Sequence, residues 1–254
     1  MAYDRATPAV PSLSVIVPAL NEQDSLHATV EAVLKTFGPM VDDLEILVFD
    51  DYSSDRTGCI ADELAAHDSR VRVFHNPHRF NIGGVYKAGL REARGQYVVL
   101  VPGDNEIRVD EVARGMLYLD RASMIVFYVT NPAVRSWSRR TLSRLYVLAV
   151  NALFGTQVRY TNGTNIIRTD LARTLGIRTD GFSYQTEAVI KAVRSGADFV
   201  QVGVDIKKRE GGKSKALSWK NLGTVVSALA ALWWEIHVTR RAQYRRRGMA
   251  VAVV

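Results

Sequence analysis

The sequence predicts an α/β fold in which helices flank a central, mostly parallel sheet. Two observations favour this fold. Short apolar runs alternate with segments of helical periodicity through the first half of the chain, and several of these runs end in acidic or small polar residues. The chain has 254 residues, 47% of them hydrophobic, which is enough to bury one full-sized core.

The first half of the chain is expected to contribute alternating strands and helices. The expected strands are residues 14–17, 45–49, 71–74 and 97–101. The expected helices between them are residues 26–34, 56–67 and 81–93. Strands joined by helices take right-handed crossovers, so these strands are expected to run parallel to one another.

The second half continues with one more strand and several helices. The expected elements are a strand at 124–128, a long amphipathic helix at 137–154, an Asn-Gly turn at 161–165, a helix that begins near 169–170, a helix that runs to 193, and an apolar helical stripe at 222–236. Arginines are concentrated at 240–247, immediately after that stripe.

Carboxylates follow two of the expected strands at the point where each strand ends. Asp50 and Asp51 end the second strand, and Asp104 and Glu106 follow the fourth after a Pro-Gly pair that stops it. The carboxyl ends of parallel strands meet at one edge of a sheet, where ligands bind in open α/β folds. Carboxylate oxygens suit Mg²⁺ or Mn²⁺ that also holds nucleotide phosphates. Each pair alone has a second explanation, as a cap or a polar turn, but their recurrence favours a site.

The charges divide the chain into an acidic half and a basic half. Residues 1–130 carry 12 Lys/Arg and 19 Asp/Glu, a net charge of −7, whereas residues 131–254 carry 21 and 7, a net charge of +14. The acidic half suits metal-assisted handling of a nucleotide, and the basic half suits an anionic acceptor or an anionic membrane surface. No nucleic-acid-binding motif is recognised, so nucleic acid is not an expected partner.

The sequence also indicates a cellular compartment. The single Cys59 excludes an internal disulfide and fits a reducing compartment. Residues 1–10 do not resemble a signal peptide, and no uncharged apolar stretch reaches the roughly 18 to 20 residues that span a bilayer. A cytoplasmic protein that is soluble or lies at the membrane surface is expected. We interpret His75 and His78 as part of a surface loop and not as a metal site.

Several motifs share their order and spacing with a known family. They are Pro18-Ala19-x-Asn21-Glu22, Asp50-Asp51-x-Ser53-x-Asp55, Asn81-x-Gly83-Gly84 and the strand before Asp104. With these motifs the chain resembles the inverting glycosyltransferases of family 2, which have the GT-A fold, and most of all the dolichyl- or polyprenyl-phosphate mannosyltransferases. The resemblance covers residues 12–220 and implies a GT-A domain over residues 1–215.

The resemblance implies a nucleotide and metal site. The matching donor residues are Pro18, Ala19, Glu22, Asp50, Asp51, Gly83, Asp104 and Lys215. The family's metal motif is Asp-Ala-Asp followed two residues later by Gln, and Asp104 and Glu106 match its second and third ligands. Pro102 replaces the first and cannot coordinate through its side chain. Either two protein ligands act with diphosphate and water, which Mg²⁺ tolerates, or the metal requirement is altered.

The resemblance also implies a site for the acceptor phosphate. Arg139 and Ser143 have the family's Arg-x-x-x-Ser spacing, which places them on one helix face, and Arg135 is a candidate for a further family arginine. The segment 207–215 resembles a family loop through Arg209, Gly212, Ser214 and Lys215, with Ser214 assigned to the acceptor. The alternatives are a solvated basic helix face and a basic surface loop.

The remaining assignments concern catalysis and the end of the chain. Asp104, Glu187 and Arg209 are the predicted catalytic residues; Glu187 is either a general base for an alcohol acceptor or a first-turn carboxylate favoured by the helix dipole. Residues 216–254 are expected to form an amphipathic helix with a polybasic tail at the membrane interface. The alternative is a core helix with a disordered tail.

Together these observations predict an inverting transferase that moves a hexose from GDP-mannose or a UDP-hexose to a polyprenyl phosphate, peripherally at the inner face of the cell membrane. Two rivals remain. One is a family 2 transferase that acts on a hydroxyl of a glycan or lipid. The other is a catalytically silent nucleotide-sugar-binding protein, which Pro102 suggests.

Overall fold

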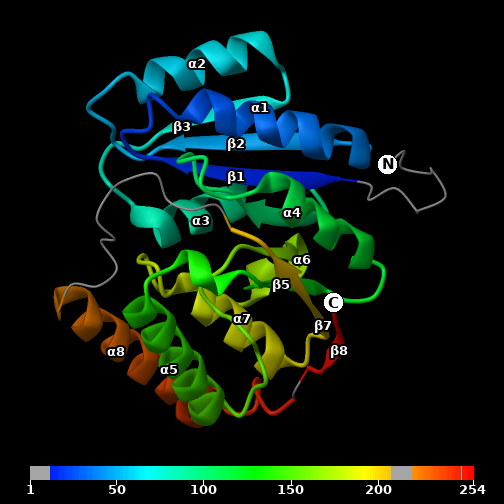
Figure 1. Cartoon of the computed structure of the whole chain (residues 1–254), viewed down its shortest axis with the longest axis vertical. Coiled ribbons are helices and arrows are strands. Elements are labelled where there is room, and N and C mark those ends of the chain that lie inside the picture. Colours follow the sequence, from blue (N-terminus) through cyan, green and yellow to red (C-terminus); the bar gives the residue numbers. More distant parts are fainter. Residues whose placement is uncertain (1–11, 207–218, 247) are drawn as a thin grey trace.

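The computed structural model describes residues 12–206, 219–246 and 248–254. Its centre is an eight-stranded sheet in the order β3-β2-β1-β4-β6-β5-β7-β8 (Figure 1). The strands are β1 (Leu13–Ala19), β2 (Leu44–Asp50), β3 (Val71–His75), β4 (Tyr97–Leu100), β5 (Met124–Val129), β6 (Asn165–Arg168), β7 (Phe199–Val204) and β8 (Ala250–Val253). Only β6 runs antiparallel to its neighbours among these strands, so the predicted mostly parallel α/β fold is confirmed.

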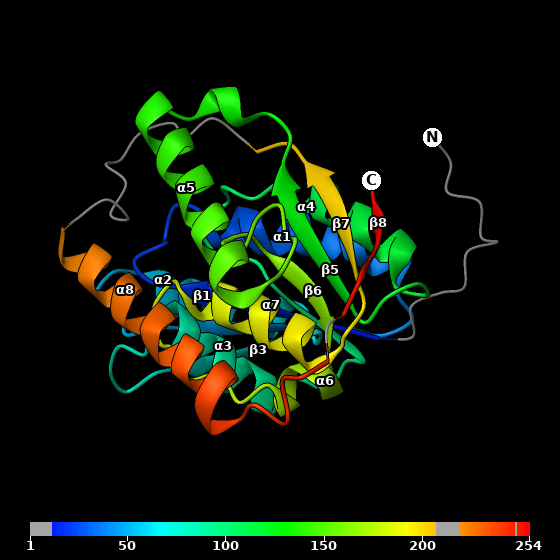
Figure 2. The same ribbon diagram turned by 90° about the horizontal axis from the view of Figure 1, so that it is seen from below.

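Helices cover both faces of the sheet (Figures 1 and 2). They are α1 (Leu26–Phe37), α2 (Thr57–His67), α3 (Asn81–Glu92), α4 (Val109–Ala113), α5 (Trp137–Phe154), α6 (Thr169–Thr174), α7 (Tyr184–Ser195) and α8 (Trp219–Trp234). Short helical turns are η1 (Gly38–Met40), η2 (Arg114–Tyr118), η3 (Pro132–Val134) and η5 (Glu235–Thr239), the last of them a single π-helical turn.

Alternate residues of β1 face two separate hydrophobic cores. Val15 and Val17 pack with α1, α2 and α4 on one side, whereas Ile16 packs with α3, α6 and α7 on the other. Side chains that alternate along a strand point to opposite faces, so a strand covered on both faces is apolar throughout. The sequence of β1 is therefore apolar on both faces except at the buried Ser14.

A third, smaller core attaches the end of the chain to the rest. Buried side chains of α5, α7, α8, η5 and the following turn form it; they are Val150, Phe154, Ile190, Leu232, Ile236 and Tyr244. Figure 2 shows α8 running beside α5 and α7. The inward side of α8 thus belongs to a core, as one of the two sequence interpretations expected.

Three strands of the second half, β6, β7 and β8, were not predicted. β7 lies between β5 and β8, and β8 pairs with β7 at the edge of the sheet. The segment 216–254 therefore contributes a strand to the sheet of the preceding domain and is more than a helix with a polybasic tail.

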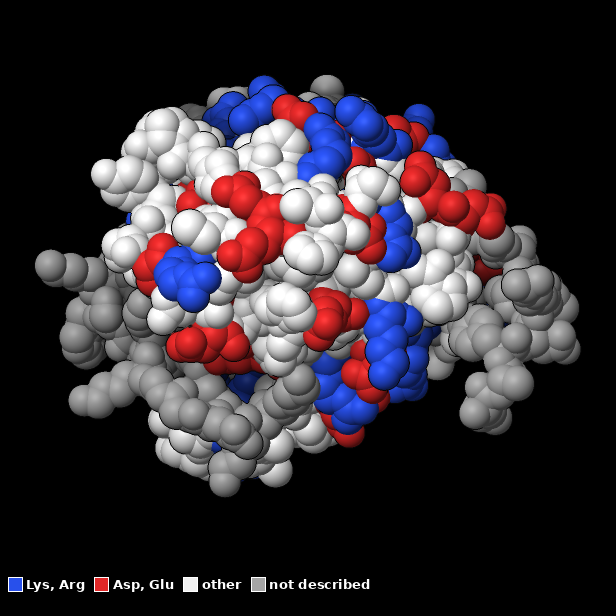
Figure 3. Space-filling view, turned by 90° about the horizontal axis from the view of Figure 1, so that it is seen from above, with Lys and Arg blue, Asp and Glu red and all other residues white. Residues whose placement is uncertain are grey.

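The described helices include none that is both long and apolar enough to cross a membrane. On the face that carries α1 and α2, acidic and basic side chains are interspersed (Figure 3). This face has a mixed surface charge, although the sequence separates the two signs into halves.

Candidate active site

The carboxyl ends of β1, β2 and β4 meet at one edge of the sheet, as predicted. Ala19 is paired with Asp50 in the parallel register, and the backbone N–H of Asp51 donates to Ala19 O at 2.8 Å. The backbone N–H of Gly103 donates to Pro18 O at 3.0 Å. The Pro18-Ala19 turn, the acidic pair and the turn that carries Asp104 are therefore immediate neighbours.

The turn after β4 presents two carboxylates. Asn105 has a φ of 53°, in the left-handed region that Asn tolerates. Asp104 Oδ1 accepts the backbone N–H of Glu106 at 3.1 Å, which closes the turn. Asp104 is partly buried and Glu106 is exposed. This geometry places both predicted metal ligands on one tight turn at the carboxyl edge.

The raised pKa of Glu22 reflects the negative charge gathered at this edge. Burial raises the pKa of its carboxyl, and although a hydrogen bond from Ser25 opposes that rise, the charges of Asp104, Glu106 and Asp55 raise the pKa further. Carboxylates from three different loops therefore repel one another here. A bound cation would relieve that repulsion.

The donor set at this edge fits a divalent ion that has few protein ligands. Within the described residues, no group of three or more His, Cys, Asp or Glu side chains is arranged to hold a metal. Asp104 and Glu106 offer hard oxygens, and Pro102 offers no side-chain ligand. Mg²⁺ and Mn²⁺ keep several ligands from water and phosphate, so two carboxylates match a site completed by a diphosphate.

Asp50 is held at the end of β2 by polar partners. Its Oδ1 accepts the backbone N–H of Ser53 at 3.1 Å, and its Oδ2 lies 3.3 Å from His75 Nδ1. The other ring nitrogen of His75 lies 3.1 Å from Asp62 Oδ1. The hydrogen bond to Asp62 raises the pKa of His75 most; burial opposes that rise, and the hydrogen bond to Asp50 adds to it. His75 is thus an ion-pair partner of a predicted donor residue, which the sequence interpretation of a plain surface loop missed.

Asp51 has a structural role in addition to the donor role proposed for it. Its side chain is 4% exposed and accepts hydrogen bonds from Asn76 Nδ2 at 2.8 Å and from the backbone N–H groups of Phe80 at 2.7 Å and Asn81 at 2.9 Å. These bonds fix the start of α3 to the end of β2. The donor contact of Asp51 stays a prediction.

The two turns that flank the donor edge are joined by hydrogen bonds. The backbone N–H of Asn21 donates to Ser53 Oγ at 3.0 Å, and its Oδ1 accepts the N–H of Ser54 at 2.9 Å. The N–H of Glu22 donates to Thr57 Oγ1 at 2.8 Å. The motif residues Asn21 and Ser53 therefore connect the turns to each other, and Thr57 joins them although no sequence motif indicated it.

Gly83 lies where two backbones approach closely. Its N–H donates to Asp180 O at 2.7 Å, and a Cβ at this position would collide with the carbonyl oxygen of Thr179. The glycine is thus required for packing of α3 against residues 179–180. Its assignment to the donor site stays a prediction.

The acceptor candidates lie in and before α5. Arg139 and Ser143 are both partly buried, and they lie four residues apart on this helix, as expected. Arg135 donates from Nη1 to the Tyr160 hydroxyl at 3.1 Å, with its guanidinium 5.7 Å from that ring centroid. Arg209, Ser214 and Lys215 lie outside the described residues.

Glu187 is engaged by the protein around it. It is 5% exposed, and its two oxygens accept the backbone N–H groups of Arg178 and Thr179, each at 2.9 Å. Lys191 Nζ lies 2.7 Å from Glu187 Oε1. Burial alone would raise the pKa of this carboxyl, but the bonds from Lys191 and Thr179 hold it below its usual value. The geometry favours a structural carboxylate at the helix start over a general base.

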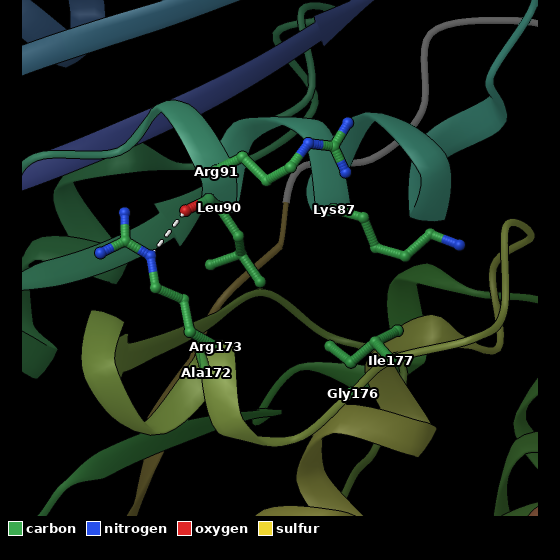
Figure 4. A pocket seen from close by; sticks show the side chains of 7 residues that line it. All are labelled: Lys87, Leu90, Arg91, Ala172, Arg173, Gly176 and Ile177. Atoms are coloured by element: carbon green, nitrogen blue, oxygen red, sulfur yellow. Dashed lines mark hydrogen bonds between the residues drawn. The ribbon is translucent and has the colours of Figure 1, made fainter.

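A cavity of about 280 Å³ lies elsewhere, between α3 and the segment 172–177 (Figure 4). None of the predicted site residues is among the seven that line it. The donor edge and this cavity are therefore separate features.

The sequence model of glycosyl transferase family 2 matches residues 14–176, which is well over half of the chain. The chain belongs to glycosyltransferase family 2. Among curated relatives of this family 2 enzyme, polyprenol monophosphomannose synthase of Mycolicibacterium smegmatis is 31% identical over 79% of this chain and 79% of its own length. Undecaprenyl-phosphate mannosyltransferase of Micrococcus luteus is 28% identical over 79% of this chain and 85% of its own length.

Other similar proteins are more distant or longer. Glycosyltransferase AglD of Haloferax volcanii is 27% identical, and the chain spans 40% of its length. Glucosyl-3-phosphoglycerate synthase from Mycobacterium tuberculosis, solved with Mn²⁺, UDP and phosphoglyceric acid, superposes with a TM-score of 0.60 at 19% identity and covers 89% of this chain and 78% of its own. That likeness confirms the GT-A fold predicted for this family 2 member.

Proposed function

We propose that this enzyme transfers a hexose from a nucleoside diphosphate sugar, GDP-mannose or a UDP-hexose, to a polyprenyl phosphate at the cytoplasmic face of the membrane. Two relatives whose names state polyprenyl-phosphate mannosyl transfer support the acceptor class. The observation that carries the proposal is the turn with Asp104 and Glu106, which lies against the Pro18-Ala19 turn at the carboxyl edge of the sheet. This arrangement suits a nucleotide whose diphosphate meets a divalent cation.

The reaction is a direct displacement at the anomeric carbon, in which the acceptor oxygen forms a bond as the bond to the nucleoside diphosphate breaks. Asp104 and Glu106 would hold Mg²⁺ or Mn²⁺, which when bound neutralises charge on the departing diphosphate. Arg209 and Lys215 are proposed to assist that departure. A phosphate monoester has a second pKa of about 6, so the acceptor is already largely a dianion at neutral pH and needs orientation more than deprotonation. Orienting it is the role proposed for Arg135, Arg139, Ser143 and Ser214.

An exposed apolar surface supports membrane association. It comprises outward side chains of the neighbouring helices α5 and α8 with η5, namely Trp137, Leu142, Leu145, Leu148, Leu153, Val226, Trp233, Trp234 and Val238. We call it the α5–α8 surface. Arg139, Arg140 and Arg144 lie in the first turns of α5. Tryptophan and arginine beside aliphatic side chains are typical of segments that lie at a bilayer interface.

The deciding experiment offers radiolabelled GDP-mannose and UDP-glucose separately with polyprenyl phosphate in detergent, with Mg²⁺, Mn²⁺ or EDTA. The expected result is a metal-dependent product that partitions into organic solvent. Slow hydrolysis of one donor without lipid product would retain the donor site and remove the acceptor proposal. Donor binding without any turnover would favour the silent binding protein.

The metal ligand is tested by substitution. Asp104→Ala is expected to lower metal-dependent transfer by about 100-fold or more, because several kcal/mol of charge stabilisation is at stake. Asp110→Ala is the matched control, since Asp110 is an exposed aspartate of α4 that pairs with Arg108. Full metal-dependent activity of Asp104→Ala would remove the central assignment.

A further inference from the structure

Three ionisable side chains are buried together where α7 meets the end of the chain. Lys191 is 0% exposed, Glu235 3% and Glu187 5%. Lys191 Nζ lies 2.7 Å from Glu187 Oε1 and 3.2 Å from Glu235 Oε2, and it donates to Gly176 O at 2.9 Å. The three donors of the ammonium group thus have three acceptors. We call Glu187, Lys191 and Glu235 the buried triad.

Arginines lie around the buried triad on the side of η5. Arg178 Nε is 3.5 Å from Glu235 Oε2, and Arg240 Nη1 is 3.5 Å from Glu235 Oε1. The positive charges of these two arginines offset the negative charge of the Glu235 carboxylate. Buried ion pairs seldom add much net stability over apolar side chains, but removing one partner is costly because it leaves a buried charge uncompensated. A triad of this kind fixes geometry more than it contributes free energy.

The geometry that the triad fixes is that of the segment 176–180. Glu187 accepts the N–H groups of Arg178 and Thr179, and Lys191 binds the carbonyl oxygen of Gly176. Gly176 has a φ of +58°, so the chain turns sharply there. The carboxylate of Glu187 and the ammonium group of Lys191 therefore bind three backbone groups of this short segment.

Segment 172–180 in turn holds α3 at both ends. At the start of the helix, Asp180 O accepts the N–H of Gly83, and from the middle of the helix Lys87 Nζ donates to Arg178 O at 3.0 Å. At its end, Arg173 donates from Nε to Leu90 O at 2.9 Å. Figure 4 shows α3 above α6 and residues 176–177, with the cavity between them. These polar contacts add to the apolar packing of α3 in the second core and tie the helix to segment 172–180 on both sides of the cavity.

We infer that Glu187, held by Lys191 and Glu235, is a positioning residue for the donor: it fixes segment 178–180, against which the first turn of α3 is placed at the donor edge. The inference rests on the proposed function, since it concerns binding of the nucleotide donor, to which the family resemblance assigns Gly83. It also makes η5 part of the donor-site framework, although Glu235 lies far along the chain from the donor motifs.

The test combines binding with hydrogen exchange. Glu187→Gln replaces one acceptor oxygen by a donor, so it can no longer accept both N–H groups. We expect its Kd for GDP and UDP with Mn²⁺, measured by calorimetry, to rise about tenfold, with the donor KM rising in parallel and kcat and the acceptor KM unchanged. Glu235→Gln leaves a Lys191–Glu187 pair without net charge, and its Kd for the two nucleotides is expected to rise about threefold. Glu63→Gln, an exposed ion-pair carboxylate of α2, is the control.

Amide hydrogen exchange separates the inference from the proposed function. In Glu187→Gln, exchange at Arg178, Thr179 and Gly83 is expected to quicken at least tenfold, while amides of β1 and β2 keep wild-type rates. If wild-type protein binds neither nucleotide, the proposed function fails, but quickened exchange at Gly83 still supports the positioning role. Wild-type exchange at Gly83 in a folded Glu187→Gln protein overturns it. If that variant does not fold, the same measurement on Glu235→Gln decides.

Discussion

The carboxylate of Asp51 accepts one side-chain and two backbone hydrogen bonds in a buried position at the end of β2. Asp51→Ala would leave those donors without their charged acceptor. We expect the free energy of unfolding to fall by about 3 kcal/mol, because bonds to charged groups are strong and buried unsatisfied donors are costly. Urea unfolding measures this change. Asp24→Ala, at an exposed site of the same edge, is expected to stay within about 0.5 kcal/mol of wild type.

His75 makes stability depend on pH. Its pKa is raised in the folded protein by Asp62 and Asp50, so its protonated form contributes stability that is fully present below its ordinary pKa of about 6.5. That contribution is lost as the pH rises through the raised value. The difference in unfolding free energy between wild type and His75→Gln should therefore shrink from about pH 5 to about pH 9. A difference that does not change with pH would contradict this ion pair.

At the scale of elements, α5, α7 and the end of the chain depend on one another through the third core. Phe154 is fully buried there, at the end of α5. Phe154→Ala is expected to lower the free energy of unfolding by about 3–5 kcal/mol. Leu148→Ala on the same helix, where Leu148 is 64% exposed, should have little effect. Chemical denaturation of both variants measures the difference, and equal losses would mean that this core does not stabilise the domain.

The sequence was most informative where local signals were complete. It predicted an amphipathic helix at 137–154, and α5 has these bounds; in the structure Gly155 follows it in the left-handed conformation that caps helices. It missed β6, β7 and β8. β8 is four residues long and pairs with a strand some fifty residues earlier, so its place in the sheet follows from the tertiary fold. β7 did have a signal, the apolar run after Gly196.

The sequence predicted where the candidate site lies in the fold, but not which residues its carboxylates contact. Acidic strand ends indicate the edge, because parallel strands align their carboxyl ends. The partners of those carboxylates come from distant loops. The bonds from α3 to Asp51, from His75 to Asp50 and from Lys191 to Glu187 follow from packing that no local spacing encodes.

For the whole molecule, the proposed membrane attachment depends on the α5–α8 surface and the excess positive charge of the second half. The double variant Leu145→Ser/Leu148→Ser should weaken binding to anionic lipid vesicles about tenfold, since two exposed side chains lose burial in lipid. Vesicle co-sedimentation measures this affinity. Leu117→Ser, at a 40% exposed leucine of η2, is the control outside that surface. Equal binding of the double variant and wild type would place attachment elsewhere.

The antiparallel strand β6 determines when the two parts of the sheet can be joined during synthesis. It lies between β4 and β5 and is the strand through which the group β3-β2-β1-β4 and the group β5-β7-β8 are joined. As the chain leaves the ribosome, the first group is complete once β4 has emerged, but it gains its link to β5 only after residue 168. Folding of this enzyme is therefore expected to include a non-local step in which the four-residue β6 joins β5 to the first group, before β7 and β8 extend the sheet.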